Sequence, residues 1–153
     1  MSVDSHDVLS FKSLIDDEYM VIVVYPESVH YGRFKSLIGS VNGGIAALAT
    51  EHKAIIVDGV ELEEISSDQF KAVQAHEICH GVLKHGSGPI EIEEIEADLT
   101  AIDLLIKIGE HKASEALRER LREQRGIEYN EKSLSSNLSP QSLDLYNQYR
   151  SRF

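Results

Sequence analysis

The stretch VQAHEICHGVLKH, residues 73–85, contains three histidines, a glutamate and the only cysteine of the chain. Its centre, HEICH, has the form His-Glu-x-x-His, which can hold a metal ion when it lies on a helix. A motif this short also occurs by chance, so it gives a hypothesis that the surrounding sequence has to support.

The surrounding residues predict a helix. Ser66 followed by Gln69 is a capping-box signature for its start, and Gly86 favours its end. At about 100° per residue, His76 and His80 lie about 40° apart on one face, so both rings can reach a single ion. Beside them runs an apolar stripe that predicts core packing, formed by Ala75, Ile78, Cys79 and Val82.

Glu77 lies about 100° further round the helix than His76, where it can reach a metal-bound water but hardly the ion. Hydrolysis catalysed by a zinc ion needs this arrangement, because imidazoles hold the ion while a carboxylate takes a proton from the zinc-bound water. The alternative is a partly buried helix with hydrogen-bonded histidines and a surface glutamate. For Cys79, core packing is favoured over a thiol switch.

A zinc site needs a third protein ligand. A third histidine in the pattern H-E-x-x-H-x-x-G-x-x-H requires glycine at position 83 and histidine at position 86, where this chain has Leu83 and Gly86. His85 is one residue short of that position, and we expect it to interact with the dipole at the helix C-terminus.

A glutamate from a second helix is the other source of a third ligand. Gly88-Pro89 opens this helix, predicted over residues 90–109. Glu94 falls on a mostly apolar face, where a carboxylate costs free energy unless it is paired or bound to a metal. The opposite face is expected to be solvated, so Glu93 and Glu96 are not expected to bind the metal. That face also carries Thr100, Asp103 and Lys107.

Asp98 lies one turn after Glu94 and is placed to accept a hydrogen bond from a ligand imidazole. The alternative is that Glu94 and Asp98 only stabilise the helix N-terminus, where acidic residues are favoured. That explanation suits Glu91 and Glu93 well and suits Asp98 poorly, because Asp98 lies beyond the first turn.

These two motifs, HEICH and EIEAD (94–98), resemble those of the gluzincin zinc metallopeptidases. A hairpin, a His-Glu-x-x-His helix and a Glu-x-x-Ala-Asp helix in this order are similar to the soluble ImmA/IrrE-type peptidases. The Glu-x-x-Ala-Asp signature itself is closest to the HtpX-like and CAAX-protease group of membrane proteins. The resemblance covers roughly residues 44–108, and only 13 residues separate His80 from Glu94.

The resemblance implies His76, His80 and Glu94 as zinc ligands, Glu77 as general base and Asp98 as the residue that orients a ligand histidine. It also implies a small zincin-like fold, in which short strands pack on the active-site helix. The expected function is hydrolysis of protein or peptide substrates by a zinc-dependent metallopeptidase. The alternatives are a catalytically silent zinc-binding regulatory protein and an enzyme that cuts a single partner.

The rest of the chain predicts an α+β domain over residues 1–153, with a core at about 44–108 and a helical part at 110–153. Residues 19–26 predict a buried strand, and 43–59 a hairpin with its second strand at Ala54 to Val57. Substrate is expected to add a strand beside Ala54 to Val57.

Helices are predicted at 113–126 and 140–153, and the second of them is expected to dock onto the domain through its aromatic residues. A peptidase also needs a side chain that donates a hydrogen bond to the oxyanion of the reaction. The candidates, among which the sequence gives no preference, are His30, Tyr31, His52, His111 and Tyr129.

The bulk composition narrows the partners. A formal charge of −11 disfavours nucleic acid and anionic membranes, and a single cysteine excludes an intrachain disulfide. No stretch approaches the ~20 apolar residues of a membrane helix, and the N-terminus lacks the features of a signal peptide. We therefore expect a cytoplasmic protein, whose oligomeric state the sequence does not predict.

Overall fold

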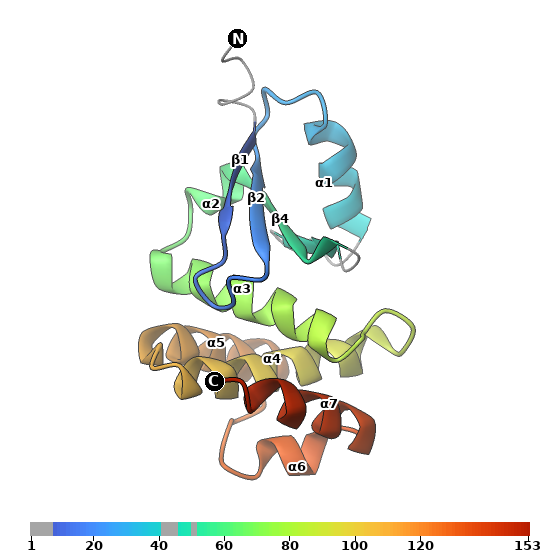
Figure 1. Ribbon diagram of the computed structural model, residues 1–153, viewed down its shortest axis with the longest axis vertical. Helices are drawn as coiled ribbons and strands as arrows, with labels where there is room; N and C mark the ends of the chain where they lie inside the picture. Colours follow the sequence, from blue (N-terminus) through green and yellow to red (C-terminus); the bar gives the residue numbers. More distant parts are fainter. Residues whose placement is uncertain (1–7, 41–45, 50–51) are drawn as a thin grey trace.

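The structure, a computed structural model, has a sheet at one end and helices at the other (Figure 1). It describes residues 8–40, 46–49 and 52–153, and within these ranges four strands form one sheet in the order β1-β2-β4-β3. The strands are β1 (Val8–Lys12), β2 (Met20–Val24), β3 (Ala46–Ala49) and β4 (Ala54–Asp58). β2 and β4 are parallel, whereas β1 and β3 each pair antiparallel with a neighbour.

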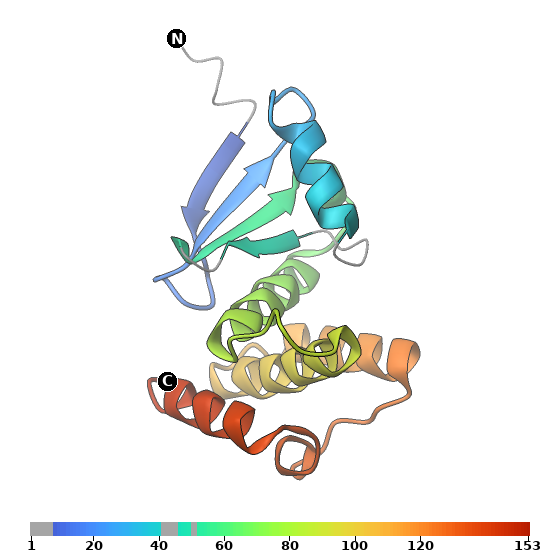
Figure 2. The same cartoon turned by 90° about the vertical axis from the view of Figure 1, so that its right-hand side faces the viewer.

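Both faces of the sheet are covered, and successive side chains of each strand point to opposite faces. Val21 and Ile55 point into the main core, and the next residues, Ile22 and Ile56, point to the opposite face. Helix α1 (Tyr31–Ser40) covers that opposite face (Figure 2) and packs Phe34 against it. The near-continuous apolar run of β2 is therefore explained by contacts on both sides.

Helix α3 (Ser67–Val82) lies between the sheet and the remaining helices. The predicted capping box is confirmed, with reciprocal hydrogen bonds between Ser66 and Gln69. The helix ends before Gly86, because Lys84 takes a left-handed conformation (φ 57°) and turns the chain.

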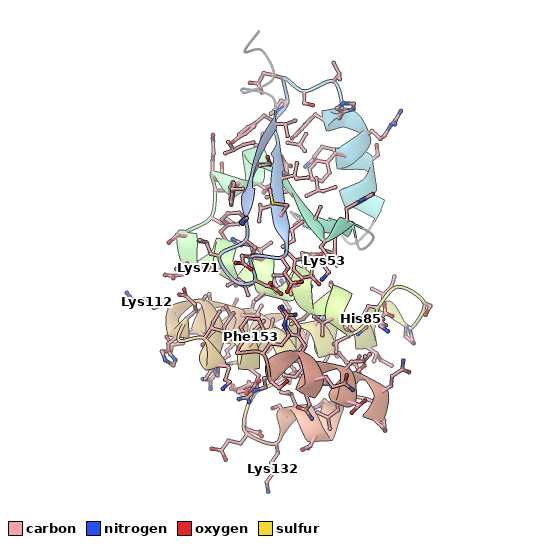
Figure 3. The ribbon with its side chains drawn as sticks, viewed as in Figure 1. Lys53, Lys71, His85, Lys112, Lys132 and Phe153 are labelled. Carbon is pink, nitrogen blue, oxygen red and sulfur yellow. The ribbon has the colours of Figure 1, made fainter. Side chains whose placement is uncertain are left out.

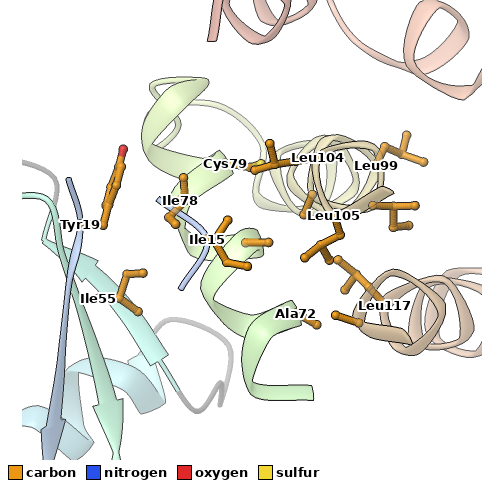
Figure 4. Packing of buried hydrophobic residues seen from close by; sticks show 14 of the residues in the cluster. Ile15, Tyr19, Ile55, Ala72, Ile78, Cys79, Leu99, Leu104, Leu105 and Leu117 are labelled. Atoms are coloured by element: carbon orange, nitrogen blue, oxygen red, sulfur yellow. The ribbon is translucent and has the colours of Figure 1, made fainter. Parts of the chain in front are cut away.

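Four further helices complete the fold: α4 (Ile90–Lys107), α5 (His111–Arg125), α6 (Ser133–Asn137) and α7 (Pro140–Arg150), within the part of the chain that is described after α3. Figure 4 shows how α3 contacts both layers: Ile78 lies toward Ile55 of the sheet, and Cys79 toward Leu104 of α4. Cys79 is fully buried, which confirms its predicted place in the core.

The strand predicted within 19–26, the strand pair within 43–59 and the helices begun at Ser66, Pro89 and Ser139 are confirmed. Residues 43–45 and 50–51 of that hairpin lie outside the described residues. The sequence patterns did not predict β1, α1, α6 or the one-turn helix α2 (Gly59–Leu62). Among the described residues, we find no helix with both the length and the apolar character that a membrane crossing demands.

The expectation that a substrate adds a strand beside Ala54 to Val57 is wrong. β4 hydrogen-bonds β2 on one side and β3 on the other, so its backbone groups are already paired. β1 and β3 stand at the two ends of the strand order within the described residues.

The prediction of a solvated face on α4 is also wrong. Glu96 is 4% exposed and Thr100 is fully buried. The C-terminal helices contact this side of α4, where Tyr146 and Arg150 both donate hydrogen bonds to Asp103. Docking of the C-terminal helix is confirmed by the burial of Tyr146 and Tyr149, whereas Phe153 remains 36% exposed.

The interlayer core predicts a sharp contrast between two apolar residues of α4. Leu105 is 0% exposed, and Leu105→Ala should lower the free energy of unfolding by about 2–5 kcal/mol through lost contacts and a cavity. Ile92 is 52% exposed on the same helix, and Ile92→Ala should change it by about 0.5 kcal/mol or less. Urea denaturation of both variants measures the difference, and equal losses would contradict this core assignment.

Candidate metal centre

Three side chains from two helices bring their ligand atoms together. His76 and His80 extend from one face of α3, and Glu94 reaches them from the first turns of α4. The Nε2 atoms of the two histidines lie 3.0 Å apart. Oε2 of Glu94 lies 2.5 Å from Nε2 of His80 and 3.2 Å from Nε2 of His76.

This triangle fits a small metal ion. Four ligands at about 2.0–2.1 Å from a tetrahedral ion stand about 3.3 Å from one another. The three observed separations are close to that value or shorter, so small outward movements of the side chains would be enough to reach it. His76, His80 and Glu94 therefore form a group that could hold a metal ion.

The electrostatics of the three groups favour a cation. Burial raises the pKa of Glu94, but the hydrogen bonds and charges of His76 and His80 outweigh it and hold that pKa well below its usual range. Burial lowers the pKa of His76, but Asp98 and Glu94 outweigh it and raise this pKa to about 10. Without a metal the cluster thus retains a proton, which a bound ion must displace.

Asp98 contacts His76 as the sequence predicted. Its Oδ1 lies 2.7 Å from Nδ1 of His76, on the ring edge opposite the atom that faces Glu94. The same oxygen accepts a hydrogen bond of 2.9 Å from Nη2 of Arg120 on α5. Burial raises the pKa of Asp98, and the contacts with His76 and Arg120 lower it below its usual value. The Asp98 carboxylate is therefore set to orient the His76 ring.

Glu77 is next to the triad without being part of it. Burial raises the pKa of its carboxyl, and the charges of His76 and His80 offset that rise only in part. Within the described residues its side chain makes no hydrogen bond, in contrast to Glu94 and Asp98. A carboxylate left without a partner beside two histidines is available to a water or a substrate.

The ring of His85, which was expected near the dipole at the helix C-terminus, contacts two side chains. Its Nδ1 lies 2.8 Å from Nδ1 of His80, and its Nε2 lies 2.9 Å from Oε1 of Glu96. The left-handed turn at Lys84 folds His85 back to the end of α3, where Figure 3 shows it. Helical periodicity cannot find this contact, because His85 lies beyond the last helical residue.

Within the described residues, none of the five predicted oxyanion donors makes a hydrogen bond to the triad. His30, His52 and His111 are exposed, whereas Tyr31 and Tyr129 donate hydrogen bonds to Asp58 and Asp103. Arg120 was missed, because nothing in its own helix marks it as a partner of Asp98.

Comparisons with known family models, with curated proteins and with solved structures found no match to this chain. The geometry and chemistry of its own residues therefore identify this candidate centre.

The geometry separates two neighbouring glutamates. Glu94→Gln should weaken Zn²⁺ binding by more than about 100-fold, because it removes a ligand charge and not only an outer partner. Glu93 instead accepts hydrogen bonds from the backbone of Gly86 and Gly88, so Glu93→Gln should bind Zn²⁺ within about threefold of the unmodified chain. Competition against a chromophoric chelator measures both, and a reversed order would exclude Glu94 as the ligand.

Proposed function

We propose that the chain is a zinc-dependent metallopeptidase with a small zincin-like fold. The observation that carries this proposal is the convergence of His76, His80 and Glu94 with Glu77 beside them and unpartnered among the described residues. The family resemblance of the two motifs supports the same function.

The donor set favours zinc. Two imidazole nitrogens and one carboxylate oxygen are the ligands of many catalytic zinc sites, whereas structural sites are closed by four protein ligands. Within the described residues, the His, Cys, Asp and Glu side chains that converge here number three. A bound zinc ion would polarise a carbonyl group and acidify a water in the remaining position.

Glu77 is the proposed general base. Burial raises the pKa of its carboxyl toward the neutral pH range, and a base whose pKa lies near the working pH can both accept and return a proton. Glu77 would take a proton from the attacking water and deliver it to the amine that leaves when the peptide bond breaks. Asp98 and Arg120 would keep the His76 ring in place during this step.

The strand that can accept an extended substrate is β3, and not Ala54 to Val57. β3 stands at the end of the strand order and contacts α3. Leu48 packs against Gly81, the residue after His80, where an added Cβ would lie 2.9 Å from Leu48 Cδ2. A peptide that added to β3 through backbone hydrogen bonds would therefore run close to His80.

Zinc content is the first test of this function. Protein purified without a metal-chelating tag should carry about one zinc per chain, because three converging ligands and two oriented imidazoles give tight binding. Elemental analysis measures the ratio. A value near zero, combined with no tight uptake on titration, would exclude the zinc centre.

Glu77→Gln separates an enzyme from a zinc-binding regulatory protein. The substitution keeps the size of the side chain and removes the base, so zinc content and melting temperature should stay close to those of the unmodified chain. Cleavage should fall by at least about 100-fold, the lower end of general-base contributions. His76→Ala is the contrasting variant, which should lose the metal and lower the melting temperature.

The substrate can be found by comparing new peptide N-termini in cells that express the unmodified chain or Glu77→Gln. Cleavage at equal rates on a confirmed substrate would rule out Glu77 as the base. If neither protein generates new N-termini while both bind zinc, the regulatory alternative is favoured.

A further inference from the structure

Glu96 is a buried carboxylate that links the C-terminal segment, through His85, to the triad of His76, His80 and Glu94. Its Oε2 accepts a hydrogen bond of 2.9 Å from the backbone N–H of Ser139. Its Oε1 accepts from the hydroxyl of Ser142 at 2.8 Å and faces Nε2 of His85 at 2.9 Å. Two donors and one imidazole nitrogen thus surround one carboxylate that is almost removed from water, and that imidazole is the neighbour of His80.

When an ion occupies the triad in place of the contact between His80 Nε2 and Glu94, the hydrogen atoms in this chain of contacts have one consistent arrangement. His80 turns Nε2 toward Glu94 and His76, so a neutral His80 ring that offers this atom to an ion carries its hydrogen on Nδ1. Nδ1 of His80 then donates to Nδ1 of His85, which must carry no hydrogen. The hydrogen of His85 is therefore on Nε2, where the Glu96 carboxylate accepts it.

We propose that Glu96 and His85 are the positioning residues of His80, and that the C-terminal segment at Ser139 and Ser142 holds Glu96 in place. The inference rests on the proposed metal centre and adds a second support to it. His76 receives its carboxylate directly from Asp98, whereas His80 receives one through the intervening imidazole of His85. Both ligand rings are thereby fixed in orientation and tautomer.

This arrangement links metal binding to the docking of the C-terminal helix. Ser139 is the N-cap of α7, and the same helix is attached to α4 through Tyr146 and Arg150 at Asp103. If docking of α7 stabilises the ring orientation that binds metal, metal binding stabilises the docking by the same free energy. The tail is thus part of the metal centre although it contributes no ligand.

Zinc affinity of the full chain tests the proposal. Glu96→Gln keeps the shape of the side chain but cannot accept from all three donors, and we expect zinc binding about 10–100-fold weaker. Glu93→Gln is the matched control from the same helix, expected within about threefold of the unmodified chain. His85→Leu, which fills the same space without ring nitrogens, should also weaken binding by about 10-fold or more.

The double variant His85→Leu/Glu96→Gln tests whether the two residues act through one another. Because both contacts belong to one relay, the double variant should bind zinc no more weakly than the weaker single variant. Losses that multiply would show two independent effects and overturn the relay. Circular dichroism of each variant verifies that it is folded, and His85→Leu remains informative should Glu96→Gln fail to fold.

Nitrogen-15 spectra of the unmodified, zinc-loaded chain give a readout that a merely structural contact would not determine. We expect His80 protonated at Nδ1 and His85 protonated at Nε2, and the reverse tautomer at His85 would overturn the proposal. If the unmodified chain binds no zinc, the metal centre itself fails. If it binds zinc and Glu96→Gln binds equally well, the relay alone is wrong.

Discussion

The close approach of α3 and α4 is the constraint on which the rest of the structure depends. The seven residues 83–89 join the two helices, and the short loop keeps the end of α3 beside the beginning of α4. Ala97 and Ala101 are fully buried along α4, and their small side chains let the helices meet. This contact brings Glu94 to the two histidines, and a wider separation would leave its half-buried carboxylate without a partner.

A second consequence is that α4 carries the carboxylates of Glu94, Glu96 and Asp98 within little more than one turn, and each of them needs its own donors. Glu94 receives them from α3, and Asp98 from α3 and α5 through His76 and Arg120. Glu96 receives them from the loop after α3 and from α7. The helices around α4 therefore satisfy its charges as well as cover its apolar side chains.

The same arrangement gives different contacts to the side chains around the triad of His76, His80 and Glu94, which could hold a metal ion. Glu94, on the side of α4 that faces α3, is the carboxylate that could hold an ion. Asp98 contacts Nδ1 of His76, and Glu96 contacts His85, which in turn contacts Nδ1 of His80. Glu77 differs from all of these because its carboxyl is next to the cluster and is not engaged by another described side chain. A purely structural centre has no evident use for such a group, which is the physical reason to prefer catalysis.

Local geometry is what the sequence by itself determined. The one-turn spacing of His76 and His80, the Ser66 cap, and the separation of Glu94 from Asp98 all follow from the helical repeat, and the structure has each of them. Periodicity could not show that the opposite face of α4 is buried, because the residues that cover Glu96 are Ser139 and Ser142, more than 40 positions later. Nor could it show that β4 is enclosed between β2 and β3, because strand order depends on pairings between distant segments. The place of His85 beside His80 was decided only by the tertiary structure, since a left-handed turn at Lys84 breaks the repeat and a buried carboxylate from α4 holds the ring where the turn leaves it.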